Sequence, residues 1–323
     1  MIPKISVIMS TLNTDELYLN EAINSILSQT YRNFEFIIVV DGGKDFEFIK
    51  RNFGYDKRIK IIKHYEVKGL PYSLNESIMV AKGDYIARMD SDDISVKNRL
   101  EVQMKYMEMH KDVDMTSMYY KEIGEGNKHV LDIFIKPEEI NAKLFYINNI
   151  SHPCVMLRKS SIVNKKLFYN TSFLYSQDFE LWTRDLNLKI KIIPKFGLKY
   201  RIHSKQISSE KRVSQDEYYF SILERNLERL HMDKVNLKYL LYLNGRKKIE
   251  DLRGLAIFVQ NTIEKNDIIK IYDKKSLNKI LNLSFSLACL KNRKIFNKYC
   301  FKNVHYLLWF LILKIKCYVR LFA

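Results

Sequence analysis

Three aspartates stand close together at Asp90, Asp92 and Asp93, immediately after a short apolar run. Carboxylates this close repel one another and lose solvent, which is costly without a neutralising cation. A hard divalent ion such as Mg²⁺ or Mn²⁺ binds carboxylate oxygens together with the phosphate oxygens of a substrate. The same residues could instead form a solvated acidic turn that caps the following helix. Their position at the end of an expected strand favours the metal site.

Alternating strand and helix patterns surround this cluster in the first 120 residues. Short apolar runs predict strands, and apolar residues at helical spacing predict helices. The expected strands are 5–10, 34–40, 58–63, 84–89 and 113–119, and the expected helices are 16–28, 71–82 and 97–110. Such alternation is typical of an α/β fold with a Rossmann-like, mostly parallel sheet flanked by helices.

Polar residues follow three of these strands, at the edge where open α/β sheets bind ligands. Thr11 and Asn13 come after the first strand, Asp41 after the second, and the aspartate cluster after the fourth. The chain contains neither a GxGxxG nor a GxxxxGK[ST] motif, which argues against a dinucleotide or P-loop site. A nucleotide would therefore be held by side chains and a metal ion.

The positive charge is concentrated towards the end of the chain. The formal net charge is +17, which suggests a polyanionic partner, and residues 274–323 carry eleven Lys or Arg and no Asp or Glu. An apolar, aromatic run at 306–313 is too short to cross a bilayer, for which ~20 residues are needed. We expect a catalytic domain over 1–213, with halves 1–120 and 121–213, and a helical, basic and apolar region over 214–323. The four cysteines form no CxxC, which favours a reducing compartment.

Several segments, in order along the chain, resemble motifs of glycosyltransferase family 2, an inverting family with the GT-A fold. The opening strand and loop 5–13, the helix 22–31, the acidic loop 34–45 and the region 69–84 are similar to its nucleotide-binding half. The run Arg88-Met89-Asp90-Ser91-Asp92-Asp93, with Arg99 and Gln103 after it, resembles the DxD strand and the following helix. His152-Pro153 resembles the acceptor-side strand of the family. The run Gln177-Asp178-Phe179-Glu180-Leu181-Trp182 resembles its catalytic-base segment, and Arg201-Ile202-His203 resembles a late loop near the diphosphate. The resemblance covers about residues 3–210.

The resemblance implies a role for each candidate residue. Asp178 is the implied catalytic base, with a helix cap as its structural alternative and Glu180 as the next candidate for the base. The implied metal ligands are Asp92, Asp93 and His203, and His203 could also donate to the diphosphate or be an ordinary loop residue. The implied nucleotide-sugar contacts are Thr11, Asn13, Asp41, Asn75, Arg88 and Asp90. The chain departs from the family in having one Asp after the second strand instead of two, which leaves the nucleotide base open.

These observations predict a metal-dependent, inverting glycosyltransferase that uses Mn²⁺ or Mg²⁺. The expected donor is a nucleotide-sugar, with UDP the commonest choice in the family. The expected acceptor is a saccharide or lipid-linked saccharide in surface polysaccharide or glycolipid synthesis. We expect a cytoplasmic protein lying peripherally on the anionic inner face of the membrane, without a nucleic-acid partner. The alternatives are an inactive scaffold with the same fold and a basic nucleic-acid-binding protein, although the chain has no recognisable nucleic-acid module. A sugar nucleotidyltransferase is disfavoured because no Gly-rich loop follows the first strand.

Overall fold

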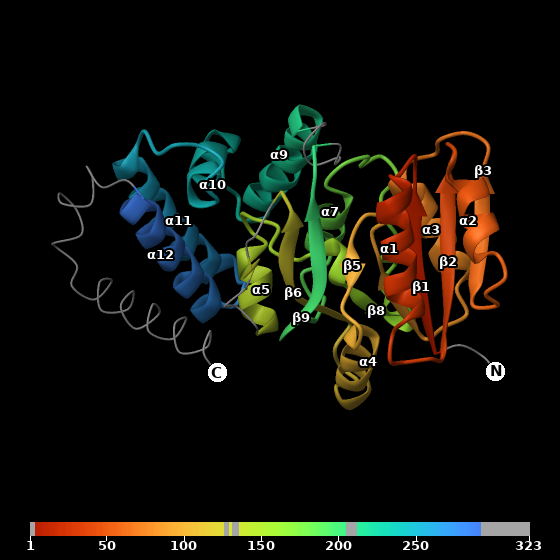
Figure 1. The fold of residues 1–323 in the computed structure, drawn as a ribbon. Helices are drawn as coiled ribbons and strands as arrows, with labels where there is room; N and C mark the ends of the chain where they lie inside the picture. The colour runs from red at the N-terminus through yellow and green to blue at the C-terminus, as the bar shows by residue number, and fades with distance from the viewer. Residues whose placement is uncertain (1–3, 126–128, 131–135, 205–211, 292–323) are drawn as a thin grey trace. The chain divides into compact units, whose positions relative to one another are not determined.

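A computed structural model describes residues 4–125, 129–130, 136–204 and 212–291. Its strands are β1 (Ile5–Thr11), β2 (Phe34–Asp41), β3 (Ile59–His64), β4 (Tyr85–Arg88), β5 (Ile94–Ser95), β6 (Met115–Gly124), β7 (His129–Val130), β8 (Met156–Arg158) and β9 (Ile190–Ile202) (Figure 1). Its helices are α1 (Glu16–Leu27), α2 (Asp45–Phe53), α3 (Leu70–Val80), α4 (Arg99–Met109), α5 (Pro137–Lys143), α6 (Lys159–Asn164), α7 (Gln177–Arg184), α9 (Arg212–Arg229), α10 (Leu237–Leu243), α11 (Leu252–Ile269) and α12 (Lys274–Lys291), with 3₁₀ turns η1 (His152–Cys154) and η2 (Lys234–Asn236). The predicted α/β fold with C-terminal helices is confirmed.

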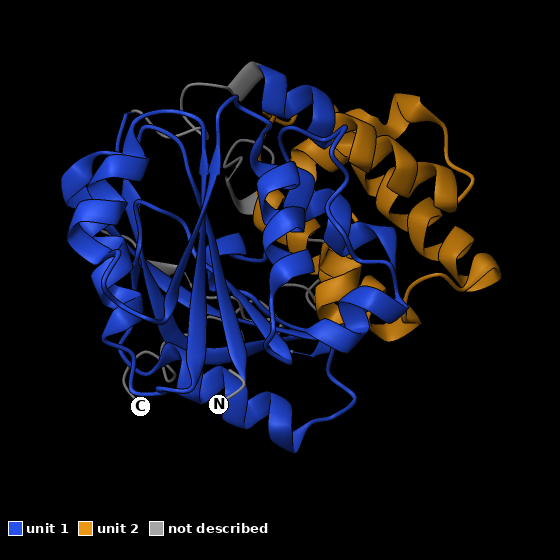
Figure 2. Ribbon diagram, turned by 90° about the vertical axis from the view of Figure 1, so that its right-hand side faces the viewer, with its two compact units in different colours: residues 1–137, 149–219 blue, residues 138–148, 220–323 orange. Residues whose placement is uncertain are grey.

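The chain divides into two compact units (Figure 2). The first comprises residues 1–137 and 149–219, and the second comprises residues 138–148 and 220–323. The first unit contains the sheet and all of the candidate site residues. The second unit is helical in its described part.

The sheet of the first unit has the strand order β3-β2-β1-β4-β8-β6-β9-β5, with β7 paired to β6. Strands β1 to β4 pair in parallel, whereas β8 runs antiparallel to β4 and β6, so the sheet is mixed beyond β4. The register sets Thr11 opposite Val40 and Asp41 opposite His64. The carboxyl ends of β1, β2, β3 and β4 therefore meet at one edge, where the sequence predicted a site.

Helices cover both faces of this sheet. Alternate residues of β1, namely Ile5, Val7 and Met9, are buried in one core cluster with residues of α1, α2 and α4. On the other face, α3 packs against β1 and β2 and buries Leu74 and Ile78. Because both faces are covered, the strands are apolar almost without interruption, as is usual for parallel sheets.

Local signals start the helices that flank the site. The Asp15 side chain accepts hydrogen bonds from the backbone N–H groups of Leu17 and Tyr18, which caps α1. Gly69 has a φ of +92°, a conformation that suits glycine, and Pro71 occupies the first turn of α3. These two caps fix where the loops after β1 and β3 turn back towards the sheet.

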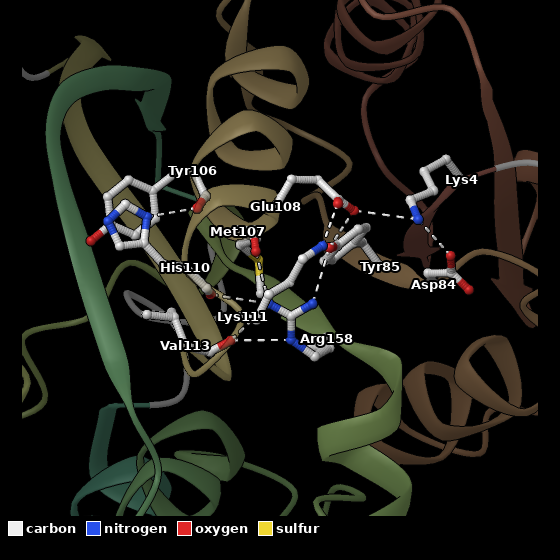
Figure 3. A network of polar contacts seen from close by, with 10 residues as sticks. All are labelled: Lys4, Asp84, Tyr85, Tyr106, Met107, Glu108, His110, Lys111, Val113 and Arg158. Carbon is white, nitrogen blue, oxygen red and sulfur yellow. Dashed lines mark hydrogen bonds and ion pairs between the residues drawn. The ribbon is translucent and has the colours of Figure 1, made fainter.

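A polar network fastens α4 to the amino end of β4, opposite the candidate site (Figure 3). The guanidinium of Arg158 donates to the Tyr85 hydroxyl and to three backbone carbonyl oxygens, those of Met107, His110 and Val113. Glu108 Oε1 accepts a hydrogen bond from the Tyr85 hydroxyl oxygen at 2.7 Å, and the Glu108 carboxylate forms ion pairs with Lys4 and Lys111. This network ties three elements together and leaves the opposite edge for ligands.

The second unit has its own apolar core, which includes Leu255 and Leu281. Residues 138–148 belong to it because the Asn226 side-chain amide donates to the carbonyl oxygens of Leu144 and Phe145, and the Tyr146 hydroxyl contacts Ser284. No helix among the described residues is long and apolar enough to cross a membrane. The apolar run at 306–313, on which the membrane prediction depends, lies outside the described residues.

Candidate active site

The aspartate cluster lies directly after β4, at the carboxyl edge of the sheet. Asp90, Asp92 and Asp93 each offer a carboxylate oxygen, and these three atoms lie within 4.8 Å of one another. Asp93 is fully buried, while Asp90 and Asp92 are half-buried. Such a spacing suits several oxygen ligands around one divalent cation.

The electrostatics of the cluster also fit a cation. Burial raises the pKa of the Asp93 carboxyl well above its usual value, and the charges of Asp90 and Asp92 raise it further. One Asp93 oxygen accepts the Arg201 backbone N–H at 2.8 Å, and the other, Oδ2, is buried without a hydrogen-bond partner among the described residues. A divalent ion would neutralise this repulsion, so the residues present fit the expected metal.

The end of β9 brings two more groups to the cluster. His203 Nε2 lies 3.0 Å from Asp92 Oδ2, although 111 residues separate the two in sequence. Burial and Asp90 raise the pKa of Asp92, and His203 opposes that rise. Arg201 donates to the Asp92 carbonyl oxygen at 2.8 Å and pairs with Glu21. The sequence had indicated the segment 201–203, but not that Arg201 would hold the backbone of the acidic turn.

A hydroxyl chain links the end of β1 to the acidic turn. The Thr11 hydroxyl donates to Asp45 Oδ2 at 2.5 Å, and Thr14 lies between Thr11 at 2.9 Å and the Ser91 hydroxyl at 2.8 Å. Asp45 is buried in the first turn of α2, a helix that the sequence analysis did not predict. Thr11 is therefore engaged in fixing the loop beside the cluster.

Asp41 forms a separate polar group at the end of β2. Its carboxylate accepts the backbone N–H groups of Lys68 and Gly69, each at 2.8 Å, and lies 2.8 Å from His64 Nδ1. The other ring nitrogen of His64 lies 2.6 Å from Glu76. Because ionised carboxylates only accept hydrogen bonds, these two contacts need two protons between the three side chains. Asp41 thus anchors the turn that leads into α3, and sequence reasoning missed His64 because its partners are distant along the chain.

Asn13 lies at the neighbouring turn. It has a φ of +53°, a conformation that asparagine tolerates better than most residues, and its side-chain oxygen accepts the Lys44 backbone N–H at 3.1 Å. It therefore joins the loops after β1 and β2. Among the described residues, neither Asn13 nor Asp41 forms a hydrogen bond or ion pair with the aspartate cluster.

Arg88 and Asn75 connect the cluster to the acceptor-side half. Arg88, the last residue of β4, is buried and pairs with Asp90. Asn75 donates to and accepts from the backbone of Tyr169, both at 2.8 Å, so its amide holds the segment before α7. Arg88, Asp178 and Asp90 all act electrostatically on the Tyr169 hydroxyl, whose pKa is raised chiefly by burial. Tyr169 is therefore within electrostatic range of both the predicted base and two of the predicted donor contacts.

The predicted base, Asp178, is half-buried in the first turn of α7. Glu180, the alternative, is buried and forms an ion pair with Arg184 four residues further on. Phe179 and Trp182 are fully buried. The charge of Asp178 acts on the Tyr169 hydroxyl.

A pocket of about 510 Å³ lies at the other end of β4 and is unrelated to this constellation. It is lined by the network of Figure 3, including Lys4, Asp84 and Glu108. Four of its charged residues, Lys4, Asp84, Glu108 and Lys111, are paired with one another. We therefore take the carboxyl edge of the sheet as the candidate active site.

Comparison with known proteins gives a consistent result. The model of the family described as glycosyl transferase family 2 matches residues 6–164. An uncharacterized glycosyltransferase of Methanocaldococcus jannaschii is 40% identical over 229 residues, which are 67% of this chain and 78% of that protein. The O-antigen biosynthesis glycosyltransferase WbnJ of Escherichia coli is 37% identical over 209 residues, covering 62% of this chain and 80% of WbnJ. Among solved structures, residues 1–349 of S. aureus TarS in complex with UDP-GlcNAc superimpose with a TM-score of 0.60 at 17% identity, over 86% of this chain and 90% of that one.

Proposed function

The chain belongs to glycosyl transferase family 2 and is a glycosyltransferase, and from this premise we propose that it is inverting and metal-dependent. The proposed donor is a UDP-sugar, a choice supported by the UDP-GlcNAc bound to the structural relative TarS. The proposed acceptor is a hydroxyl group of a saccharide or lipid-linked saccharide, supported by the O-antigen role in the name of WbnJ. The observation that carries the proposal is the carboxylate cluster of Asp90, Asp92 and the buried Asp93 at the carboxyl edge of the sheet.

The reaction breaks one bond and forms another at the anomeric carbon. The acceptor hydroxyl oxygen attacks this carbon from the face opposite the diphosphate, and the bond to the diphosphate oxygen breaks with its electron pair leaving on the diphosphate. Asp178 takes the proton of the hydroxyl group as general base. Its low intrinsic basicity is sufficient when the proton leaves late in the transition state.

The leaving diphosphate needs its charge neutralised. Asp92 and Asp93 would hold a Mn²⁺ or Mg²⁺ ion, which supplies Lewis-acid stabilisation of the diphosphate when bound. His203 lies beside Asp92 and would complete the set as a ligand or as a donor to the diphosphate. Arg201 keeps the acidic turn in place through the Asp92 carbonyl and the Asp93 carboxylate.

The nucleoside would occupy the opposite side of the same edge. We assign base or ribose contacts to Asp41, Asn13 and Thr11, which lie at the ends of β2 and β1 or in the loops that follow. Asp90 would bind the ribose hydroxyls or share the metal. Asn75 would act through Tyr169, because its amide is paired with the backbone of that residue. Arg88 would contact the sugar of the nucleotide-sugar.

Binding of UDP is expected to require a divalent ion. The chain offers carboxylates and no Gly-rich phosphate loop at this edge, so UDP alone would meet repulsion from Asp90, Asp92 and Asp93. Isothermal titration calorimetry of UDP in Mn²⁺ and in EDTA measures this. We expect binding in Mn²⁺ and a loss of roughly tenfold or more in affinity in EDTA. Equal affinities would overturn the metal role.

The C-terminal sequence is proposed to hold the enzyme on the cytoplasmic face of an anionic membrane, with nucleic acid not a partner. Each Lys or Arg near anionic lipid contributes about 1 kcal/mol, and the apolar run at 306–313 adds burial of about 25 cal/mol per Å². Flotation with anionic liposomes should show salt-sensitive binding of the full chain and little binding of a chain ending at Lys302. A full-length variant with Lys314, Lys316 and Arg320 changed to Gln is the matched control for charge. Equal flotation of the full and shortened chains would contradict the role of the tail.

A further inference from the structure

Arg88 is a buried cation whose hydrogen bonds are incomplete. Its side chain is 3% exposed, and only Nη2 has a partner among the described residues, the Asp90 carboxylate. The Nε and Nη1 atoms are buried without a hydrogen-bond partner among the described residues. A buried guanidinium normally places its five N–H donors, because each one left unsatisfied keeps its full desolvation cost.

Two other arginines, the fully buried Arg99 and the half-buried Arg158, show what a structural role looks like in this protein. Arg99, fully buried, donates through Nε to Gln103 and through Nη2 to the carbonyl oxygens of Arg88 and Val155. Arg158 places its donors on Tyr85 and on backbone carbonyl oxygens (Figure 3). Arg88 differs from both, because only one of its three nitrogens has a protein acceptor.

A second buried donor without a partner among the described residues is the indole N–H of Trp182, which lies beside His152. Trp182 is 0% exposed, and its indole Nε1–H has no hydrogen-bond partner among the described residues. Its ring packs edge-on against His152, with ring centroids 6.0 Å apart. His152 is linked to the Tyr169 hydroxyl at 2.8 Å, and burial followed by the nearby charge of Arg88 lowers the pKa of His152 well below its usual value. The Trp182 ring therefore packs on His152, and the charge of Arg88 acts on the same imidazole.

Arg88 and Tyr169 link these residues to the groups of the proposed mechanism. Arg88 contacts Asp90 of the acidic cluster, and Tyr169 is within electrostatic range of Asp178. The unpartnered atoms are three N–H-bearing nitrogens on two side chains, so the matching group must accept hydrogen bonds. The charge of Arg88 is already balanced by Asp90, so an added carboxylate would be a buried, uncompensated charge. A neutral oxygen fits this balance better.

We propose that Arg88 and Trp182 form a buried subsite that binds a neutral, hydrogen-bond-accepting oxygen of the transferred sugar. A ring hydroxyl and the carbonyl of an acetamido group both have this chemistry, whereas the carboxylate of a uronic acid does not suit it. The subsite would orient the sugar between Asp90 and Asp178, and His152 and Tyr169 would position it. This inference rests on the proposed function, since it assigns the sugar-binding part of the same site.

The indole N–H of Trp182 reports directly on this subsite. The chain has two tryptophans, Trp182 and Trp309, so a ¹⁵N-indole-labelled protein gives two side-chain signals and Trp182→Phe assigns them. In the presence of Mn²⁺, UDP-glucose or UDP-N-acetylglucosamine should shift the Trp182 signal, while UDP alone and UDP-glucuronate should leave it in place. GDP-mannose tests whether an uncharged sugar on a different nucleotide also shifts the Trp182 signal. If a nucleotide-sugar with an uncharged sugar bound without moving the Trp182 signal, the proposed subsite would be wrong. Buried water would then satisfy the N–H donors of Arg88 and Trp182.

Calorimetry with variants gives an independent test. Trp182→Phe removes the N–H and keeps an aromatic ring. It should lower the affinity for a nucleotide-sugar with an uncharged sugar by roughly tenfold, while the affinity for UDP stays within about twofold of the wild type. Arg88→Gln should lower the affinity for the nucleotide-sugar still more, again with little change in the affinity for UDP. Arg158→Lys is the matched control, because the partners of Arg158 all lie at the other end of β4 and β8, and it should leave both affinities unchanged. Equal weakening of UDP and nucleotide-sugar by Trp182→Phe would show a packing role only. Failure of every nucleotide to bind the wild-type protein would overturn the proposed function itself, and the subsite with it.

Discussion

Replacing Asp178 by Asn is expected to abolish sugar transfer while leaving the donor bound. The change keeps the shape of the side chain and its hydrogen-bonding capacity, but removes the carboxylate that accepts the proton of the acceptor hydroxyl. General-base catalysis contributes about 10²–10⁴-fold, so kcat should fall by roughly 100-fold or more. Affinity for UDP in Mn²⁺ should stay within about twofold, because the proposed nucleotide contacts lie on other strands.

Glu180→Gln serves as the matched control for this experiment. Glu180 is two residues away on the same helix, is buried and pairs with Arg184. Its replacement should lower stability through the lost ion pair without a comparable loss of kcat. Wild-type turnover by Asp178→Asn together with a large loss in Glu180→Gln would move the base to Glu180.

Replacing Asp92 by Asn is expected to remove both metal-dependent UDP binding and turnover. Asp92 is the member of the cluster that contacts His203, so its carboxylate joins the ends of β4 and β9 at the proposed metal. Lewis-acid stabilisation is worth several kcal/mol, so turnover should fall by about 1,000-fold or more. Calorimetry in Mn²⁺ should give the affinity that the wild type shows in EDTA.

Asp84→Asn controls for the loss of one carboxylate near the same strand. Asp84 precedes β4 at its other end and pairs with Lys4 on the surface. Such exposed pairs contribute little, so UDP binding and turnover should not change. Unchanged Mn²⁺-dependent binding in Asp92→Asn would show that the ion is held elsewhere.

The sequence predicted the first half of the sheet well because its signals are local. The apolar runs and the helical spacing located β1, β2, β4, α1 and α3 to within a few residues. Helix α2 was not predicted, because it is short and follows Gly42, Gly43 and Lys44, which indicate a loop. The antiparallel insertion of β8 between β4 and β6 depends on pairing between distant segments, which periodicity does not encode.

The same division applies to the candidate site. The aspartate cluster was visible because its members are adjacent in sequence, and the segment around Asp178 was found through its resemblance to a family motif. The residues that hold these groups in place were not predicted, because each acts through a tertiary contact. Asp45 reaches Thr11 across 34 positions, and Arg201 reaches Asp93 across 108. The unpartnered N–H of Trp182 likewise has no signature in sequence, since an apolar helical position predicts only core packing.

The most direct test of the central claim is turnover of nucleotide-sugars by the purified protein. The panel comprises UDP-glucose, UDP-N-acetylglucosamine, UDP-glucuronate and GDP-mannose, each assayed for release of the nucleoside diphosphate with Mn²⁺ and with EDTA, and with Asp178→Asn and Asp92→Asn beside the wild type. We expect the wild type in Mn²⁺ to hydrolyse slowly at least one nucleotide-sugar whose sugar is uncharged, and we expect this hydrolysis to stop in EDTA and in Asp92→Asn. Acceptor saccharides should accelerate release in the wild type but not in Asp178→Asn. Turnover that is equal with Mn²⁺ and EDTA, or that persists in both variants, would contradict the account, and complete absence of release would indicate an inactive scaffold on the same fold.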